Sequence, residues 1–122
     1  KVDTGVYDPM MVVGSGVIDV LIPECRSLKE KRSVLKQLLK RTQNEFNVSI
    51  AEVDDNDQWK RARIGFCVVG NDKQYINAKM DHILDFIDRM QVAEIVKTKM
   101  EIMSMADLMD PWEGDIEKYD EF

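Results

Sequence analysis

Only two cysteines and one histidine occur among the 122 residues, and this scarcity excludes several kinds of site. Cys25 and Cys67 fit neither a metal-ligand spacing nor a framework of several disulfides. His82 lies among aspartates with no nucleophile tied to it by a motif, so we interpret it as a surface residue. A helix that starts just after Cys25 would lower the pKa of its thiol, but a plain loop residue is the favoured interpretation.

Glycine-rich loops and long apolar runs are also lacking. The only close pair of glycines, at 14 and 16, lies at the start of a predicted strand and not before a helix, so no phosphate-cradling loop is indicated. No apolar run approaches the roughly 20 residues that cross a bilayer, and no basic-then-apolar leader is visible. The sequence therefore predicts a cytoplasmic protein that binds no membrane and has no catalytic, cofactor-binding or metal-ligating residues.

Positive charge is scarce at one end of the chain. Residues 107–122 hold seven acidic residues against one lysine, which accounts for the whole net charge of −6. We therefore predict three parts: a flexible N-terminal extension over 1–10, a folded domain over 11–104, and an acidic, aromatic C-terminal extension over 105–122. Because the remainder of the chain is neutral overall, the net charge does not exclude an anionic partner.

The densest positive charge coincides with the strongest helix signal, between residues 26 and 41. Ser27 and Glu30 form a capping box that marks the helix start, and leucines recur along one side at helical spacing. An adjacent basic stripe is formed by four residues at steps of three and four: Lys29, Arg32, Lys36 and Lys40. It is interpreted either as solvated side chains or as a surface that follows nucleic-acid phosphates. Arg26, Lys31 and Arg41 are expected to add to its charge.

Apolar periodicity predicts six elements in the order strand, helix, strand, strand, helix, strand. The strands cover 12–22, 48–54, 59–69 and 92–103; the first helix ends near 45–47 and Asn71 caps the second. Glu52 shares a parity with Ile50, so a bulge or partial exposure is expected in the second strand. This order is typical of a ferredoxin-like α+β sandwich. We predict a βαββαβ fold, with a four-stranded antiparallel sheet and two helices on one face.

Strand alternation assigns other side chains to the open face of the sheet, away from the helices. Its predicted interaction residues are one aromatic and four basic residues: Trp59, Arg61, Arg63, Lys97 and Lys99. Ile95 is also assigned to the open face, and Val96 to the core. Such a face suits nucleic acid or a second subunit. Gly65 and Cys67 occupy the positions where RNA-recognition motifs carry stacking aromatics, so base recognition by this face is disfavoured. Pairing with a second copy of the chain is the favoured use.

Two segments of the predicted domain together resemble the YlxP-like family of small bacterial proteins. They are RSLKEKR at 26–32 and FNVSIAEVD at 46–54, followed by Asp57, Trp59 and Arg61-Ala62; the similarity spans about Met11 to Met103. The resemblance implies the ferredoxin-like fold. Members are commonly encoded beside translation-initiation and ribosome-maturation factors, which implies a connection with RNA or the ribosome. Both predicted extensions depart from typical members.

The sequence thus predicts a non-enzymatic protein that associates with RNA or the ribosome through the basic stripe, contacting phosphates without reading base sequence. The alternative is a homo-oligomeric interaction module, or a small-ligand-binding module, that uses the open face. We also expect the acidic C-terminal extension to mask the basic stripe. An enzyme that uses His82 or Cys25 is the third alternative.

Overall fold

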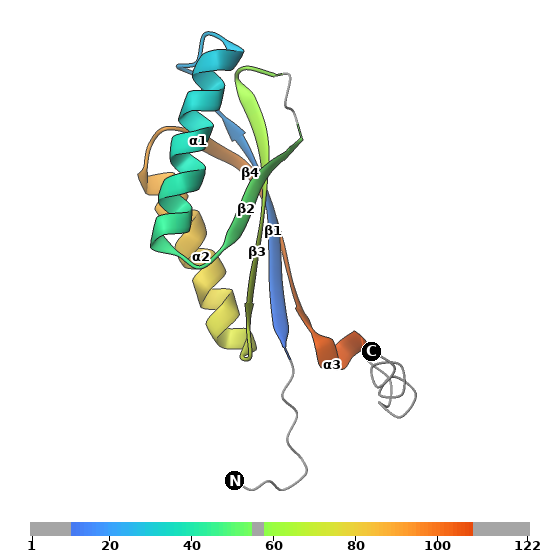
Figure 1. Cartoon of the computed structure of the whole chain (residues 1–122). Helices are drawn as coiled ribbons and strands as arrows, with labels where there is room; N and C mark the ends of the chain where they lie inside the picture. The colour runs from blue at the N-terminus through green and yellow to red at the C-terminus, as the bar shows by residue number, and fades with distance from the viewer. Residues whose placement is uncertain (1–10, 55–57, 109–122) are drawn as a thin grey trace, which may run out of the picture.

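The computed structural model describes residues 11–54 and 58–108, and it confirms the predicted βαββαβ order (Figure 1). The elements are β1 (Val12–Leu21), α1 (Leu28–Glu45), β2 (Ser49–Asp54), β3 (Arg61–Gly70), α2 (Lys73–Arg89), β4 (Glu94–Ser104) and the short α3 (Met105–Leu108). The N-terminal extension predicted over 1–10, residues 55–57, and residues 109–122 of the predicted C-terminal extension lie outside the described residues.

The four strands form one antiparallel sheet in the order β2-β3-β1-β4. Both long helices lie on the same side of this sheet, and the opposite face is open (Figure 1). Helix α1 contacts α2 and β2, whereas α2 contacts β1, β3 and β4. This is the ferredoxin-like α+β sandwich that the element order predicts.

Side-chain caps fix where the helices begin. The Ser27 hydroxyl accepts from the Glu30 amide at 3.1 Å, and the Glu30 carboxylate in turn accepts from the Arg26 amide at 2.8 Å. The capping box is thus present, with its return bond one residue earlier than usual. The second helix is capped by Asp72, whose carboxylate accepts from the Tyr75 amide at 2.8 Å. The prediction that Asn71 is the cap is wrong by one residue.

A single hydrophobic core fills the space between the sheet and the helices. Alternate residues of β1 and β3 face the helices, and Ile18 and Ile64 lie opposite each other, fully buried. Leu38 of α1 and Ile83 of α2 are fully buried above them. Gly14 lets α2 approach β1 closely, because a Cβ there would overlap two α2 side chains. The sheet is therefore fixed against the helix layer on one face only.

A β-bulge reverses part of the predicted side-chain assignment in β4. Asp19 pairs with Lys97, but the next β1 residue, Val20, pairs with Ile95, so Val96 is the extra residue. Ile95 consequently packs against the core and Val96 is exposed, the opposite of the prediction. Beyond the bulge the predicted alternation holds, and both lysines of β4 stay on the open face.

Candidate functional site

All four residues of the basic stripe are exposed on the outer side of α1. Within the described part of the chain, none of them makes an ion pair or hydrogen bond. From Lys29 to Lys40 the stripe extends roughly 17 Å at 1.5 Å per residue. The structure therefore presents a continuous line of cations whose charges the described residues leave uncompensated.

Lys31, expected to add to this charge, is instead part of the core. It is 1% exposed, and its Nζ lies 2.8 Å from Oε2 of Glu52, the inward-facing acid of β2. Its place on the helix explains this, because Leu35 and Leu38 follow at four and seven residues, on the buried side. That spacing was the signal in the sequence. The predicted irregularity of β2 is confirmed, with Glu52 partly buried and a register shift after it.

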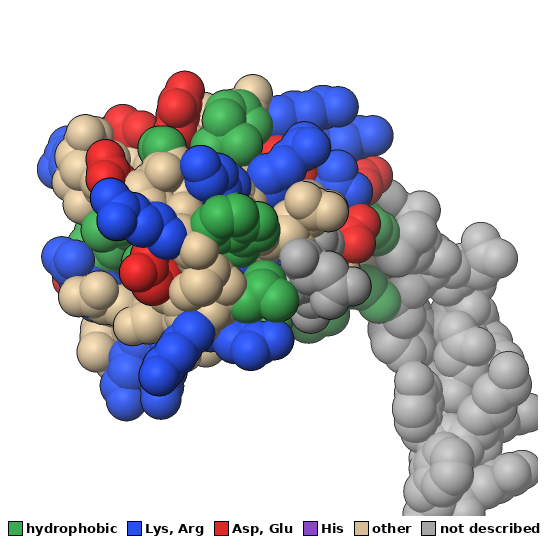
Figure 2. All heavy atoms as spheres, turned by 90° about the horizontal axis from the view of Figure 1, so that it is seen from above, with side chains coloured by type: hydrophobic (Ala, Val, Ile, Leu, Met, Phe, Trp, Pro, Cys, Tyr) green, Lys and Arg blue, Asp and Glu red, His purple; other side chains and the backbone are tan. Residues whose placement is uncertain are grey.

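The same lysine anchors the segment that precedes β3. Lys31 Nζ donates to the Gln58 carbonyl at 2.5 Å, and the Ile22 amide donates to the Lys60 carbonyl at 2.8 Å. These bonds hold residues 58–60 against the start of α1. Trp59, predicted inside a strand, therefore lies in a bend before β3; it is 43% exposed, with Lys60 Nζ 5.6 Å from its ring centre. Seen from this end, Lys and Arg side chains lie around apolar ones, interspersed with acidic and other polar side chains (Figure 2).

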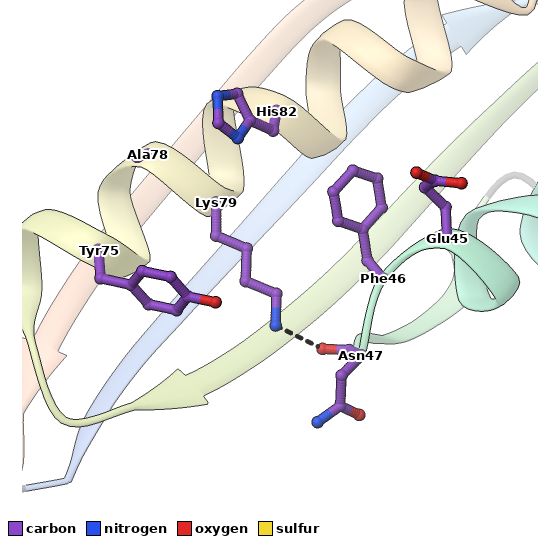
Figure 3. A pocket seen from close by; sticks show the side chains of 7 residues that line it. All are labelled: Glu45, Phe46, Asn47, Tyr75, Ala78, Lys79 and His82. Atoms are coloured by element: carbon purple, nitrogen blue, oxygen red, sulfur yellow. Dashed lines mark hydrogen bonds between the residues drawn. The ribbon is translucent and has the colours of Figure 1, made fainter.

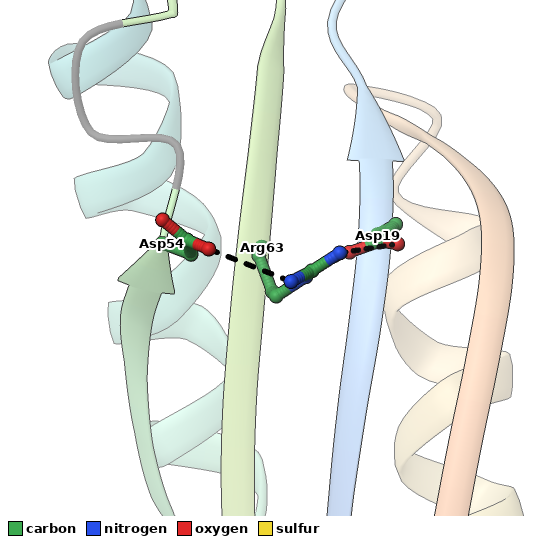
Figure 4. A network of polar contacts seen from close by, with 3 residues as sticks. All are labelled: Asp19, Asp54 and Arg63. Carbon is green, nitrogen blue, oxygen red and sulfur yellow. Dashed lines mark hydrogen bonds and ion pairs between the residues drawn. The ribbon is translucent and has the colours of Figure 1, made fainter.

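On the open face, Arg63 is held by carboxylates on the neighbouring strands. Its Nε lies 2.7 Å from Asp19 Oδ1 and its second terminal nitrogen 3.2 Å from Asp19 Oδ2, a two-pronged contact. On the other side, Arg63 Nη1 lies 3.4 Å from Asp54 Oδ2 (Figure 4). The hydrogen bond from Arg63 lowers the pKa of Asp19, and burial opposes it. Arg63 thus links three strands, and its charge is already compensated.

The rest of the open face mixes free cations with exposed apolar side chains. Arg61, Lys97 and Lys99 are exposed, and none makes an ion pair with the described residues. Its exposed apolar members include Val17, Val69 and Val53, whose side chain lies over Gly65. The structure therefore keeps four of the five predicted open-face residues accessible, namely these three cations and Trp59, and engages the fifth in the sheet itself.

A groove that the sequence did not indicate runs between the end of α1 and α2. It encloses about 420 Å³, and Phe46, Lys79 and His82 are among its lining residues (Figure 3). Lys79 Nζ donates to the Asn47 carbonyl at 3.0 Å, and Phe46 packs edge-on against Phe86 at 5.5 Å. These contacts fasten α2 to the α1–β2 connection. His82 is exposed, as predicted. Among the residues that line the groove, only Tyr75 carries a hydroxyl group and none carries a thiol.

The thiol of Cys25 is not activated. It is 2% exposed and donates to the Ser27 carbonyl at 3.9 Å. Burial, reinforced by the negative charge of Glu30, raises the pKa of Cys25, whereas a reactive thiol needs a lowered pKa. The plain structural interpretation of this residue holds.

The described ranges hold neither a metal-ligand cluster nor a helix suited to a membrane. Residues 11–54 and 58–108 contain no group of three or more His, Cys, Asp or Glu side chains placed to hold a metal ion. Among the helices of this part of the chain, none combines the length and the apolar character needed to cross a membrane.

Known proteins resemble this chain over most of the α+β sandwich. A family model described as "Protein of unknown function (DUF503)" matches residues 13–100. The uncharacterized protein YlxP of Bacillus subtilis (strain 168) is 37% identical over 90 residues, which are 74% of this chain and 98% of that protein. The de novo designed protein Foldit4 covers 77% of this chain and 94% of its own at 18% identity, with a TM-score of 0.42, too low to bear on the argument.

Proposed function

This chain belongs to the DUF503 family of proteins of unknown function, and we propose that it is a non-enzymatic cytoplasmic protein that binds RNA, free or in the ribosome, through the basic stripe. The observation that carries the proposal is the exposure of all four cations without an ion pair among the described residues. Lysine and arginine that neutralise phosphates release counterions, which drives binding without any base contact.

The position of the stripe on its helix supports a role outside the fold. Lys29 lies in the first turn of α1, where a cation opposes the helix dipole at a cost of about 0.3–1 kcal/mol in low salt. The last turn of the same helix, where cations are favourable, holds none. Lys29 therefore does not stabilise the end of the helix on which it lies, which supports a role toward a partner.

Recognition of base sequence is not part of this proposal. The outward positions of β3 that would carry stacking rings hold Gly65 and Cys67. Contacts to phosphates orient a protein on nucleic acid but read no sequence. We therefore expect similar affinities for RNAs of different base composition at equal length.

Salt dependence tests the proposal. Anisotropy titrations of a labelled 20-nucleotide poly(U) strand should give a slope of about −3 in log K against log salt, since four contacts each contribute about −0.7. The variant K29E/R32E/K36E/K40E should lose binding and co-sedimentation with ribosomal subunits. The matched control, R61E/K97E on the open face, should keep both. The proposal fails if the native protein does not bind at about 50 mM salt, or if only the control loses binding.

The second candidate function is a protein-interaction or small-ligand module on the open face. The exposed Val17 and Val69 beside free cations favour it, because apolar side chains ringed by charge are typical of interaction surfaces. A melting-temperature screen against small anionic ligands separates the two. A stabilising ligand lost in R61E/K97E and kept in the stripe variant would favour this candidate.

A further inference from the structure

Among the described strands, β4 has the longer of the two open edges of the sheet. The sheet order places β4 at one side with only β1 as its neighbour (Figure 1). No described element pairs with its other side. After the bulge at Val96 the strand runs regularly from Lys97 to Ser104. A regular edge of this length presents backbone amides and carbonyls that can serve as a template for another strand.

The side chains along this edge are complementary to themselves. Lys99 and Glu101 lie two residues apart and therefore point to the same face, the open one. Met100 lies between them on the helix side and is 37% exposed, unlike the buried methionine of α2, Met80. In an antiparallel pair with a two-fold axis at Met100, each Lys99 faces the Glu101 of the other copy.

We propose that two copies of this chain pair edge to edge through β4, with the two-fold axis at Met100, so that two four-stranded sheets form one continuous sheet of eight strands. On the open face, Lys99 of each copy then lies opposite Glu101 of the other. On the helix side, the two Met100 side chains meet, and Thr98 lies opposite Ile102. The interface is isologous, as in most homodimers, and the partner is a second copy of this chain.

Charge selects this register over its neighbours. An axis at Lys99 would form two Lys97–Glu101 pairs but would also place Lys99 opposite itself. An axis at Thr98 would place Lys97 opposite Lys99. An axis at Glu101 would place two glutamates together. Because like charges directly opposite each other destabilise a strand pair and unlike charges stabilise it, the axis at Met100 is the favourable one. A pairing offset by one residue, in which odd-numbered residues would face even-numbered ones, is excluded, since it would turn the side chains of one copy to the wrong face of the sheet.

The opposite edge of the sheet offers no comparable surface. β2 has six residues, its register shifts after Glu52, and its end carries Asp54. Bulges and inward charges are the features that keep edges from pairing. In β4 the bulge protects only the first three residues, Glu94–Val96, and leaves the self-complementary stretch regular.

A charge exchange tests the register. Sedimentation equilibrium should show a dimer for the native protein, and K99E or E101K should each weaken it by about tenfold, since either change creates two like-charge pairs per dimer. The double variant K99E/E101K restores both pairs with the charges exchanged, so its dimer should be within about threefold of native. A native protein that stays monomeric up to about 1 mM would overturn the proposal. A dimer that neither single change weakens, or a double variant that remains as weak as the singles, would also overturn it.

A cross-link tests the axis itself. In a Cys67→Ser background, Met100→Cys should form a disulfide-linked dimer on mild oxidation, because residues that face each other across an antiparallel pair have Cβ atoms about 4.5–5.5 Å apart. Thr98→Cys is the matched control; its thiol would lie opposite Ile102 and should not cross-link. Efficient cross-linking of the control and not of Met100→Cys would refute this axis. Since the basic stripe lies on α1, the stripe variant should dimerise normally, so failure of this proposal and failure of RNA binding are distinguishable.

Discussion

Replacing Glu52 by alanine tests whether the buried ion pair holds α1, β2 and the segment before β3 together. The change removes the carboxylate 2.8 Å from Lys31 Nζ and leaves the ammonium almost fully buried. Removing one partner of a buried pair costs roughly 3–5 kcal/mol, because the remaining charge loses a group that offset its desolvation. The Gln58 carbonyl still accepts a hydrogen bond from the ammonium. We therefore expect a loss near the lower limit, about 3 kcal/mol.

The reciprocal change should cost less. In Lys31→Met the group left behind is Glu52, whose Oε2 is buried but whose side chain is 19% exposed overall, so the expected loss is about 1–2 kcal/mol. Replacing both partners with apolar residues of similar size removes the desolvation cost together with the pair. K31M/E52L should therefore unfold within about 1 kcal/mol of the native protein.

Urea unfolding followed by circular dichroism measures these free energies, with an unchanged slope showing that only stability has changed. Lys36→Met is the matched control, since Lys36 is exposed on the same helix and should shift stability by no more than about 0.5 kcal/mol. The reasoning is refuted if E52A loses less than about 1 kcal/mol. It is also refuted if the double variant loses as much as the two single variants added together.

Three further outcomes are expected. Arg63 lowers the pKa of Asp19 below its usual 3.8, so the pair contributes its full stability above that pH and loses it as the pH falls through the lowered pKa. Arg63→Met should therefore flatten the pH dependence of the melting temperature in that acid range. An unchanged pH dependence would contradict the pair. Because burial raises the pKa of Cys25, iodoacetamide at pH 8 should alkylate Cys67 first, and mass spectrometry showing the reverse order would contradict the burial. Gly14→Ala should cost about 1–3 kcal/mol in a melting experiment, since the added methyl would overlap α2; no loss would mean that the helix can move away.

The fold could be predicted because its signals are local. The capping box at Ser27, the leucines of α1 and the alternation in β3 each need only a few neighbouring residues to be recognised. The family resemblance over 26–32 and 46–54 is likewise confirmed by the family match at 13–100. Two right-handed crossovers around a hairpin leave few topologies for such an order, so the sheet order followed.

The details of the site needed pairings that a sequence does not contain. Ile95 and Val96 are both apolar, so nothing in composition indicates which of them is the bulge residue; only the pairing with β1 decides it. Arg63 was assigned to the open face, but its contact with Asp19 depends on the register of β1 against β3. Lys31 is a different case, because its spacing from the leucines already placed it on the buried side. Counting charges along the helix, without its periodicity, led to the wrong prediction.

The placement of α1 over β2, at the far side of the sheet from β4, decides what an edge-linked pair would do with a polyanion. With neighbouring strands about 4.8 Å apart, the two cationic helices would stand roughly 30 Å from each other, at opposite ends of the joined sheet. A nucleic-acid strand long enough to reach both helices would bind the second helix at an effective concentration in the millimolar range. The two weak contacts together would then give a higher apparent affinity, which an oligonucleotide too short to reach both helices could not obtain.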